Sequence, residues 1–283
     1  MARNKTEYSS SEADGWAAHV DNYIKVVEPL TRGPTEALVN EVDKLLPFTG
    51  PDVRVLDNGS GTGLLASYLA AKYPEVPIVA ADISSGMLEN LEKKAEKKGW
   101  KAVETKTIDA LDLQSLADNP FSHVLSTFML GSISSPLQGV QEMYKVTKPG
   151  GILGIAVWDH NIVWSDVWRE TIRRSQNKPF YEPPLIFDPS MCYKDTVEKT
   201  LKGAGWDDAE VSVQQTYYAP WDSADAACDF FWNGKNPIVE MFVRGWEDNV
   251  EQIKPVLRQV YEELYGSGKH QGCPTIQAIA WKR

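Results

Sequence analysis

The sequence of 283 residues is poor in cysteine and has no excess of positive charge, and each shortage excludes a class of function. The three cysteines, Cys192, Cys228 and Cys273, are sparse, odd in number and without the spacing of a metal site. Lys and Arg number 29 against 39 Asp and Glu, which gives a net charge of −10. Binding of DNA or RNA normally needs a basic surface. We therefore expect no metal site and no nucleic-acid partner.

Long hydrophobic runs are missing as well. The longest run, residues 152–158, has the length of a buried strand and is far shorter than a membrane span. Residues 1–15 are polar and contain no apolar core of a signal peptide. Sparse cysteines fit reduced thiols in a reducing compartment. We expect a cytoplasmic protein without a membrane partner, and the sequence leaves its oligomeric state open.

Apolar periodicity divides the chain into helical flanks and a central alternation of strands and helices. Residues 12–30 and 35–46 have helical spacing, and Gly33-Pro34 predicts a break between them at residues 31–34. Short apolar runs then alternate with helical segments, which is typical of parallel β-α-β units. The predicted strands are residues 53–57, 77–82, 103–108, 121–128 and 152–158, with a tight turn at 148–151 and later strands at 211–218 and 275–281.

The central motif is VRVLDNGSGTG at residues 53–63, which follows a predicted strand and opens a predicted helix. Its glycines, Gly59, Gly61 and Gly63, allow backbone N–H groups to approach a ligand with no Cβ in the way. In a dinucleotide-binding loop of spacing G-x-G-x-x-G the third glycine would stand at position 64, where this chain has Leu64. The loop therefore departs from the usual NAD pattern.

Two acidic residues accompany the loop. Asp82 ends the second predicted strand, where a carboxylate can accept hydrogen bonds from both hydroxyls of a ribose. Asp57 would repel a pyrophosphate but can pair with an ammonium group, directly or through water. Alone, the loop could be a plain turn and Asp82 a helix N-cap. Together they favour a nucleoside with an ammonium group and no phosphate, as in S-adenosylmethionine (SAM).

The same segments resemble the class I SAM-dependent methyltransferases. Residues 53–63 resemble motif I, residues 81–88 (ADISSGML) the acidic segment after it, residues 108–110 (IDA) the adenine-contacting motif, and residues 148–153 (KPGGIL) the turn and fifth strand. Asn58 stands where many members have another residue, and we expect no consequence for binding. Asp109, which alone could be a turn residue, would bind the adenine amino group, and Tyr23 would cover the cofactor. The cofactor-binding residues that the resemblance implies are Tyr23, Asp57, Gly59, Gly61, Gly63, Asp82, Ile83, Met87, Asp109, Ala110, Thr127 and Phe128.

Further segments resemble fungal secondary-metabolite methyltransferases of the gliotoxin thiol methyltransferase type. They are residues 83–89, 98–100, 104–106, 109–112, 256–259 and 265–266. The resemblance implies a Rossmann-like α/β fold, with a mostly parallel seven-stranded sheet, an antiparallel C-terminal strand and a helical cap. Residues 1–48 would form an N-terminal helical lid. Residues 49–283 would form the SAM-binding domain, with cap insertions near 160–200 and 219–271.

The chemistry of methyl transfer needs alignment and exclusion of water more than it needs a catalytic group. A thiol ionises readily near neutral pH, whereas a phenol more often needs a base. His160 follows the fifth strand and is the best candidate base, although we assign no catalytic residue. Aromatic side chains could form an apolar acceptor pocket or an ordinary core. The predicted substrate-binding residues are Phe128, Trp158, Trp164 and Phe231.

We therefore expect methylation of a small, aromatic or apolar natural product, with SAM as cofactor and S-adenosylhomocysteine (SAH) as product. Among the three acceptor groups, a thiol is the first choice, a hydroxyl is a close second, and an amine is the remaining alternative. Two other functions fit parts of the pattern. An NAD-dependent oxidoreductase would need a different loop, and a SAM-binding regulator or partner subunit would bind the cofactor without turnover.

Overall fold

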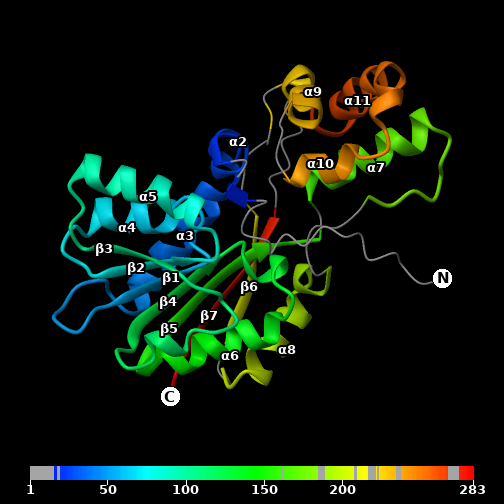
Figure 1. Cartoon of the computed structure of the whole chain (residues 1–283). Coiled ribbons are helices and arrows are strands. Elements are labelled where there is room, and N and C mark those ends of the chain that lie inside the picture. Colours follow the sequence, from blue (N-terminus) through cyan, green and yellow to red (C-terminus); the bar gives the residue numbers. More distant parts are fainter. Residues whose placement is uncertain are drawn as a thin grey trace.

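The computed structural model describes residues 16–17, 20–160, 162–183, 189–206, 209–215, 221, 223–233, 237–266 and 274–283. Cys273 and residues 216–218 of a predicted strand lie outside this part of the chain. The described residues form a seven-stranded sheet of order β3-β2-β1-β4-β5-β7-β6, with helices on both faces and a group of helices beside it (Figure 1).

The strands lie close to where the apolar runs predict them. They are β1 (Val55–Asn58), β2 (Ile78–Asp82), β3 (Val103–Thr107), β4 (Phe121–Thr127), β5 (Thr147–Trp158), β6 (Glu210–Gln215) and β7 (Pro274–Trp281). Strands β3, β2, β1, β4 and β5 pair in parallel, and β7 is antiparallel to both β5 and β6. The Rossmann-like mixed sheet with an antiparallel C-terminal strand is thereby confirmed. All four residues of β1 are buried, as expected for a strand covered on both faces.

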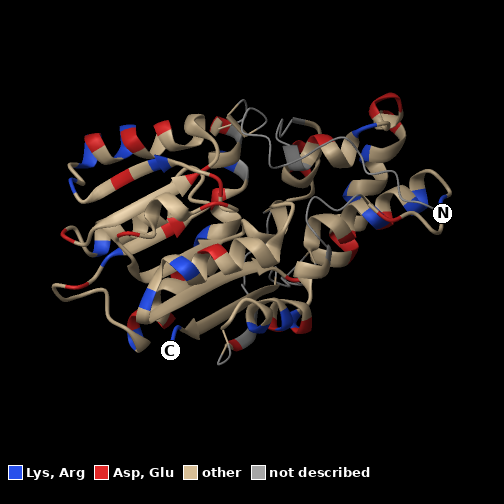
Figure 2. Cartoon of the chain, turned by 60° about the horizontal axis from the view of Figure 1, so that its bottom comes forward, with Lys and Arg blue, Asp and Glu red and all other residues tan. Residues whose placement is uncertain are grey.

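Helices α3 (Glu28–Leu45), α4 (Leu64–Lys72) and α5 (Ser85–Lys98) cover one face of the sheet (Figure 1). Their apolar sides contribute Leu38, Leu65 and Leu91, which are almost fully buried against the sheet. The other side of α5 is charged, and Lys93 forms an ion pair with Glu89 at 3.6 Å there. Figure 2 shows acidic and basic residues mixed over the helices instead of gathered by sign. The lysines of residues 93–98 (KKAEKK) thus lie on the solvent side of α5.

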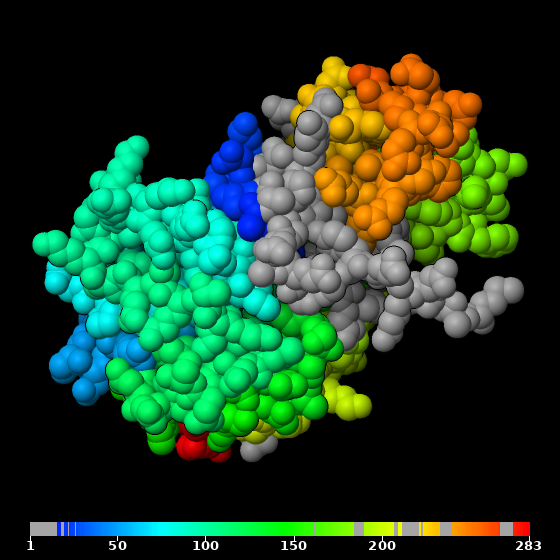
Figure 3. All heavy atoms as spheres, viewed as in Figure 1, coloured from blue at the N-terminus to red at the C-terminus, as the bar shows by residue number. Residues whose placement is uncertain are grey.

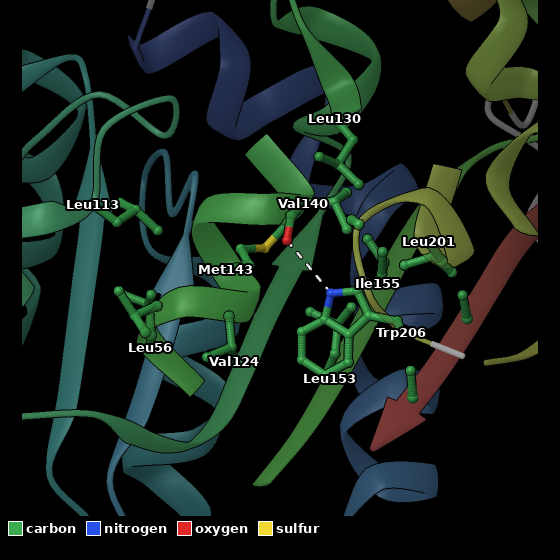
Figure 4. Packing of buried hydrophobic residues seen from close by; sticks show 14 of the residues in the cluster. Leu56, Leu113, Val124, Leu130, Val140, Met143, Leu153, Ile155, Leu201 and Trp206 are labelled. Atoms are coloured by element: carbon green, nitrogen blue, oxygen red, sulfur yellow. Dashed lines mark hydrogen bonds between the residues drawn. The ribbon is translucent and has the colours of Figure 1, made fainter. Parts of the chain in front are cut away.

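Helices α6 (Pro136–Val146) and α8 (Lys194–Gly203) cover the opposite face (Figure 1). The core between them and the sheet includes Leu56, Val124 and Leu153 (Figure 4). Trp206 is fully buried in this core, and its indole Nε1 donates a 3.4 Å hydrogen bond to the carbonyl oxygen of Val140. Satisfying its polar atom in this way allows a large aromatic side chain to be buried at little cost.

The remaining long helices form a second group, which we call the helical lobe. It contains α7 (Val163–Ser175), α9 (Ala224–Asn233), α10 (Pro237–Val243) and α11 (Val250–Tyr265). Figure 3 shows this lobe in yellow, orange and light green beside the sheet domain, with the dark blue helix α2 (Val20–Val26) at the border. Its interior is aromatic, and the rings of Trp168 and Phe231 stack at 4.7 Å. Four short 3-10 turns are also described: η1 (Gln114–Leu116), η2 (Leu130–Ser132), η3 (Pro189–Cys192) and η4 (Glu247–Asn249).

The predicted helix break at residues 31–34 is wrong. Helix α3 runs through Pro34, and the break comes earlier, between α2 and α3 at Val27. A proline inside a helix removes a backbone donor and normally costs about 3 kcal/mol. Here Pro34 is buried, and its carbonyl oxygen accepts a 2.9 Å hydrogen bond from Nε2 of Gln277 in β7. Burial of Leu38 and its neighbours against the sheet outweighs the local preference.

The predicted tight turn at residues 148–151 lies inside β5, which begins at Thr147. Thr147 pairs with Phe121 and Ile152 with His123, so the register of β5 shifts across these residues, where Gly150 has a φ angle of 74°. The N–H of Gly150 donates to the carbonyl oxygen of Lys282 at 2.7 Å, and that of Lys282 donates to Gly151 at 2.9 Å. Pairing with the end of the chain therefore draws this glycine-rich segment into the sheet. No helix of the described residues is long and apolar enough to cross a membrane.

Candidate active site

The glycine loop joins β1 to α4 at the carboxyl end of the sheet. Gly59, Gly61 and Gly63 all have positive φ angles, of 74°, 55° and 80°. The backbone N–H groups of Gly59 and Ser60 donate to the carbonyl oxygen of Ala81 at 2.8 and 2.9 Å, which ties the loop to β2. Residues other than glycine rarely adopt positive φ angles, because their Cβ atom clashes with the backbone.

The glycines of the loop have different surroundings. A Cβ atom added to Gly63 would lie 2.5 Å from Cδ1 of Leu91, so this glycine permits close packing of the loop on α5. A Cβ atom added to Gly61 would meet nothing within 4 Å. Because Gly61 also lines a cavity, its backbone is the part of the loop that a ligand can approach.

Asp82 connects this loop to the next helix. Its Oδ2 accepts a 2.8 Å hydrogen bond from the N–H of Gly61, and its Oδ1 accepts a 2.9 Å hydrogen bond from the N–H of Ser84, the N-cap of α5. Burial raises the pKa of Asp82, and the backbone N–H donors oppose that shift. Each carboxylate oxygen has a further lone pair with which it can accept from a ligand hydroxyl.

A cavity of about 190 Å³ opens above the loop. Ten of the predicted cofactor residues line it: Tyr23, Gly59, Gly61, Asp82, Ile83, Met87, Asp109, Ala110, Thr127 and Phe128. Asp57 and Gly63 do not line it. Among the described residues around the cavity there are two carboxylates, Asp82 and Asp109, and no Lys or Arg. Such a lining suits a ligand with hydroxyl and cationic groups better than one with phosphates.

Asp57 lies behind the loop instead of in the cavity wall. It is 1% exposed, and its Oδ2 accepts a 3.1 Å hydrogen bond from the N–H of Ala66 in α4. Burial raises its pKa to about 7, and the nearby charge of Asp82 adds to the shift. Its clearest structural contact is therefore with the first turn of α4, which it holds to the end of β1.

Eight further residues line the cavity that were not among the predicted cofactor-binding residues: Trp16, Asn58, Ile108, Leu111, Met129, Ser132, Ile133 and Ser134. Four of them follow β4, and loops at the carboxyl ends of parallel strands commonly bind ligands, so this rule could have found them. Asn58 is 1% exposed, and its Nδ2 has no hydrogen-bond partner in the structure. A buried donor of this kind indicates that the cavity is built for a polar ligand.

The N-terminal segment closes one side of the cavity. The rings of Trp16 and Tyr23 meet edge to face, with centroids 5.9 Å apart, and both residues line the cavity. Burial raises the pKa of Tyr23, with further contributions from the charges of Asp82 and Glu28, so its phenol keeps its proton. Ala17 lies so close to Gly86 in α5 that a Cβ atom on Gly86 would be 2.7 Å from it.

The four predicted substrate residues divide into two pairs. Phe128 lines the main cavity, and it also lines a second, small cavity of about 10 Å³ together with Trp158. Trp164 is 2% exposed and meets Trp158 edge to face at 5.0 Å. Phe231 is fully buried against Trp168 in the helical lobe. Trp164 and Phe231 thus pack in the lobe and line neither of these cavities.

The candidate base His160 also lies outside the lining of both cavities. Its Nδ1 is 3.0 Å from Oδ1 of Asp159, and its half-exposed ring stacks on Tyr193 at 4.9 Å. His123 is buried between the Ser122 hydroxyl and the carbonyl oxygen of Leu46, which is a structural position. Within the part of the chain that the structure describes, no three His, Cys, Asp or Glu side chains gather as metal ligands would.

Comparisons with known proteins identify the family to which the chain belongs. A family profile described as a methyltransferase domain matches residues 55–151. The chain is 30% identical over 264 residues to the methyltransferase ucsB of Acremonium sp., covering 88% of each protein. It is 25% identical over 184 residues to the methyltransferase tpcH of Aspergillus fumigatus, covering 62% of this chain and 64% of that one.

A similar fold occurs in a solved structure from Thermotoga maritima, described as a SAM-dependent methyltransferase and possible histamine N-methyltransferase. The TM-score is 0.55 at 18% identity, with 96% of this chain and all of that chain covered. At this level of identity the likeness concerns the fold. The two fungal relatives carry the argument about activity, and they agree with the resemblance to fungal methyltransferases.

Proposed function

Because this chain belongs to the class I SAM-dependent methyltransferases, we propose that it methylates a thiol, hydroxyl or amine of a small aromatic or apolar natural product. The observation that carries the choice of acceptor is the position of Phe128. Phe128 lines both the cavity that contains Asp82 and Asp109 and, with Trp158, a small apolar cavity. An acceptor that meets the cofactor there would be surrounded by apolar rings.

The residues of the cavity fit SAM. We propose that Asp82 binds the ribose hydroxyls, that Asp109 binds the adenine amino group, and that the backbone at Gly61 lies along the amino-acid end. Bound SAM supplies an electrophilic methyl group on a sulfonium sulfur. The family and the absence of Lys and Arg among the described lining residues both speak against NAD, whose pyrophosphate carries negative charge.

The residues of the chain itself would position the acceptor and exclude water from it. Phe128 and Trp158 exclude water from the side on which the acceptor would lie, which favours displacement at the methyl carbon. Tyr23 and Trp16 shield the cavity from the N-terminal side, as expected of a lid. For an acceptor that must lose a proton, His160 is the candidate base, because it follows β5 by two residues and has Asp159 as its partner.

Calorimetry with SAM, SAH and NAD tests the cofactor, and a screen of thiols, phenols and amines for SAH production tests turnover. We expect SAM and SAH to bind the wild-type chain, NAD to give no heat, and Asp82→Ala to lose SAM binding. Production of SAH with at least one acceptor class supports the proposed reaction. Binding without SAH production from any class in the screen would instead indicate a regulatory or partner protein.

A further inference from the structure

One aromatic residue, Phe128, belongs to the linings of both cavities of the site. Phe128 lines the cavity of about 190 Å³ that fits the cofactor, and the same residue lines the cavity of about 10 Å³ behind it. The second cavity, which we call the rear chamber, is completed by Gly131, Val157, Trp158, Met191 and Cys192. None of these side chains carries a charge, so the rear chamber is apolar throughout its described lining.

The backbone of Phe128 has an unusual conformation. Its φ angle is +61°, a region that residues other than glycine seldom occupy and that often marks a functional site. The N–H of Phe128 donates a 2.7 Å hydrogen bond to the carbonyl oxygen of Ala156 in β5, which holds the backbone in place. The chain thus keeps a strained residue directly after β4, at a position that contributes to both cavities.

Two aromatic rings of the rear chamber, those of Phe128 and Trp158, are in contact with each other but differ in burial. Trp158 is 5% exposed and is fixed from behind by Trp164, which is itself 2% exposed. Phe128 is only partly buried, and its ring centroid lies 4.3 Å from that of Trp158. Of the pair, Phe128 is therefore the ring that can swing away.

The rear chamber in this state is too small for an organic acceptor. A volume of about 10 Å³ is near the smallest that holds one water molecule. If the ring of Phe128 left its place against Trp158, the space released would have the shape of an aromatic ring and would be continuous with the cofactor cavity. A planar ligand could then stack on Trp158 as Phe128 does here.

We propose that the rear chamber is the acceptor site in its closed form, and that Phe128 is the partition which the acceptor displaces. The acceptor is a flat, uncharged aromatic ring, because it takes the place of one against Trp158. This inference rests on the proposed function. It adds the location of the acceptor, its chemical class and the side chain that moves to admit it.

The test measures binding of 2-naphthol to the SAH-saturated protein by equilibrium dialysis, with fully saturated decahydro-2-naphthol as the non-aromatic comparison. Phe128→Gly removes the ring, and glycine suits a φ angle of +61°. Trp158→Leu removes the ring against which the ligand would stack. Trp246→Leu is the matched control, since Trp246 is a partly buried indole of the helical lobe that lines neither cavity.

We expect Phe128→Gly to bind 2-naphthol about tenfold more tightly than the wild type, because no partition has to be displaced. Trp158→Leu should bind it about tenfold more weakly, while Trp246→Leu should match the wild type. The saturated alcohol should show neither change. Phe128→Leu, which keeps a bulky side chain but no ring, provides a second variant and should also bind 2-naphthol more tightly than the wild type.

Equal binding of 2-naphthol by the wild type, Phe128→Gly and Phe128→Leu would overturn the proposal. So would equal losses in Trp158→Leu and Trp246→Leu, which would indicate a general loss of structure. Titration of each variant with SAH keeps the two proposals apart. If SAH fails to bind the wild type, the proposed function fails, whereas normal SAH binding with unchanged 2-naphthol binding refutes the acceptor site alone.

Discussion

The hydroxyl of Thr62, in the glycine loop, donates a 2.6 Å hydrogen bond to the carboxylate of Glu28, which is 5% exposed at the start of α3. The other oxygen of this carboxylate lies 3.8 Å from the guanidinium of Arg32. The helices that bring Tyr23 over the cavity are thereby tied to the loop that forms its floor.

Removing this link should destabilise the protein. In Thr62→Val the buried carboxylate of Glu28 loses its hydroxyl partner, and we expect the free energy of unfolding to fall by about 1–3 kcal/mol in urea titrations. Thr105→Val is the matched control, because Thr105 donates to Glu92 at a solvent-exposed position. It should change the stability by less than about 0.5 kcal/mol. Similar losses in both variants would contradict a special role for the buried pair.

The two glycines Gly61 and Gly63 should respond differently to alanine. In Gly63→Ala the new Cβ would collide with Leu91, and we expect a loss of stability of roughly 2–4 kcal/mol in thermal or urea unfolding. In Gly61→Ala the Cβ has room, so the loss should be only about 1 kcal/mol, from the positive φ angle. That methyl group enters the cavity, and calorimetry should show weaker SAH binding. A larger stability loss in Gly61→Ala than in Gly63→Ala would refute this division.

Asp82→Asn should weaken SAH binding by about 10- to 100-fold in calorimetry, because hydrogen bonds from ribose hydroxyls to a charged carboxylate are lost. Asp112→Asn is a suitable control. Asp112 also accepts a hydrogen bond from a backbone N–H two residues ahead, at Gln114, but it is exposed and lines no part of the cavity. Its affinity for SAH should equal that of the wild type. Unchanged affinity in Asp82→Asn would remove the proposed ribose contact.

The raised pKa of Asp57, about 7, predicts a dependence of stability on pH. An unfolded aspartate has a pKa of about 3.9, so the native state holds this proton more tightly. The resulting stabilisation is complete below about pH 4 and is lost as the pH rises through 7. Asp57→Asn cannot ionise and should equal the wild type near pH 3, below the unfolded pKa. In urea titrations near pH 8 it should be more stable, by up to about 4 kcal/mol.

Asp43 is a control for this prediction, because its pKa is shifted in the opposite direction. Burial alone would raise its pKa, but hydrogen bonds from the Tyr73 hydroxyl and the Phe48 N–H lower it below the ordinary value. Its stabilisation is therefore present above the unfolded pKa and is lost as the pH falls. Asp43→Asn should lose stability relative to the wild type near neutral pH and approach it in acid. A common trend in both variants would show that the effect does not come from Asp57.

His160→Gln tests the candidate base through the acidity of the acceptor. For phenol acceptors we expect kcat to fall by about 100-fold with little change in KM, because a proton must be removed. For thiol acceptors, which ionise near neutral pH, kcat should change by less than about threefold. Asp159→Asn should show the same pattern with smaller losses, because Asp159 orients the imidazole. Equal losses for phenols and thiols would assign His160 a structural role.

The central fold was predictable because its signals are local. Residues 53–63 combine a strand, a turn that needs positive φ angles and a helix start, and Asp82 follows at the end of the next buried strand. The interruption at Pro34 misled the prediction because propensity describes an isolated helix. In the folded protein, Gln277 and the burial of α3 against the sheet decide the outcome.

The details of the site depend on contacts between distant segments. The sequence shows that Gly59, Gly61 and Gly63 form one motif, but only the approach of Leu91 shows that Gly63 serves packing. Trp164 and Phe231 belong to the same aromatic class as Phe128, and no periodicity separates residues that pack in the helical lobe from one that borders a cavity. Asn58, set aside as a neutral departure, turned out to line the cavity.

The position of β7 has a consequence for the order in which the protein can fold. This strand lies between β5 and β6, yet it is synthesised after both of them and after the whole helical lobe. While the ribosome produces α9 to α11, the finished edge of β5 and the whole of β6 have no neighbour in the native sheet. Unpaired strand edges are sites of misassembly during synthesis. In a growing chain the sheet can be completed only when β7 has been synthesised. Contact with chaperones should therefore be greatest after Gln215 and before Pro274 has left the ribosome.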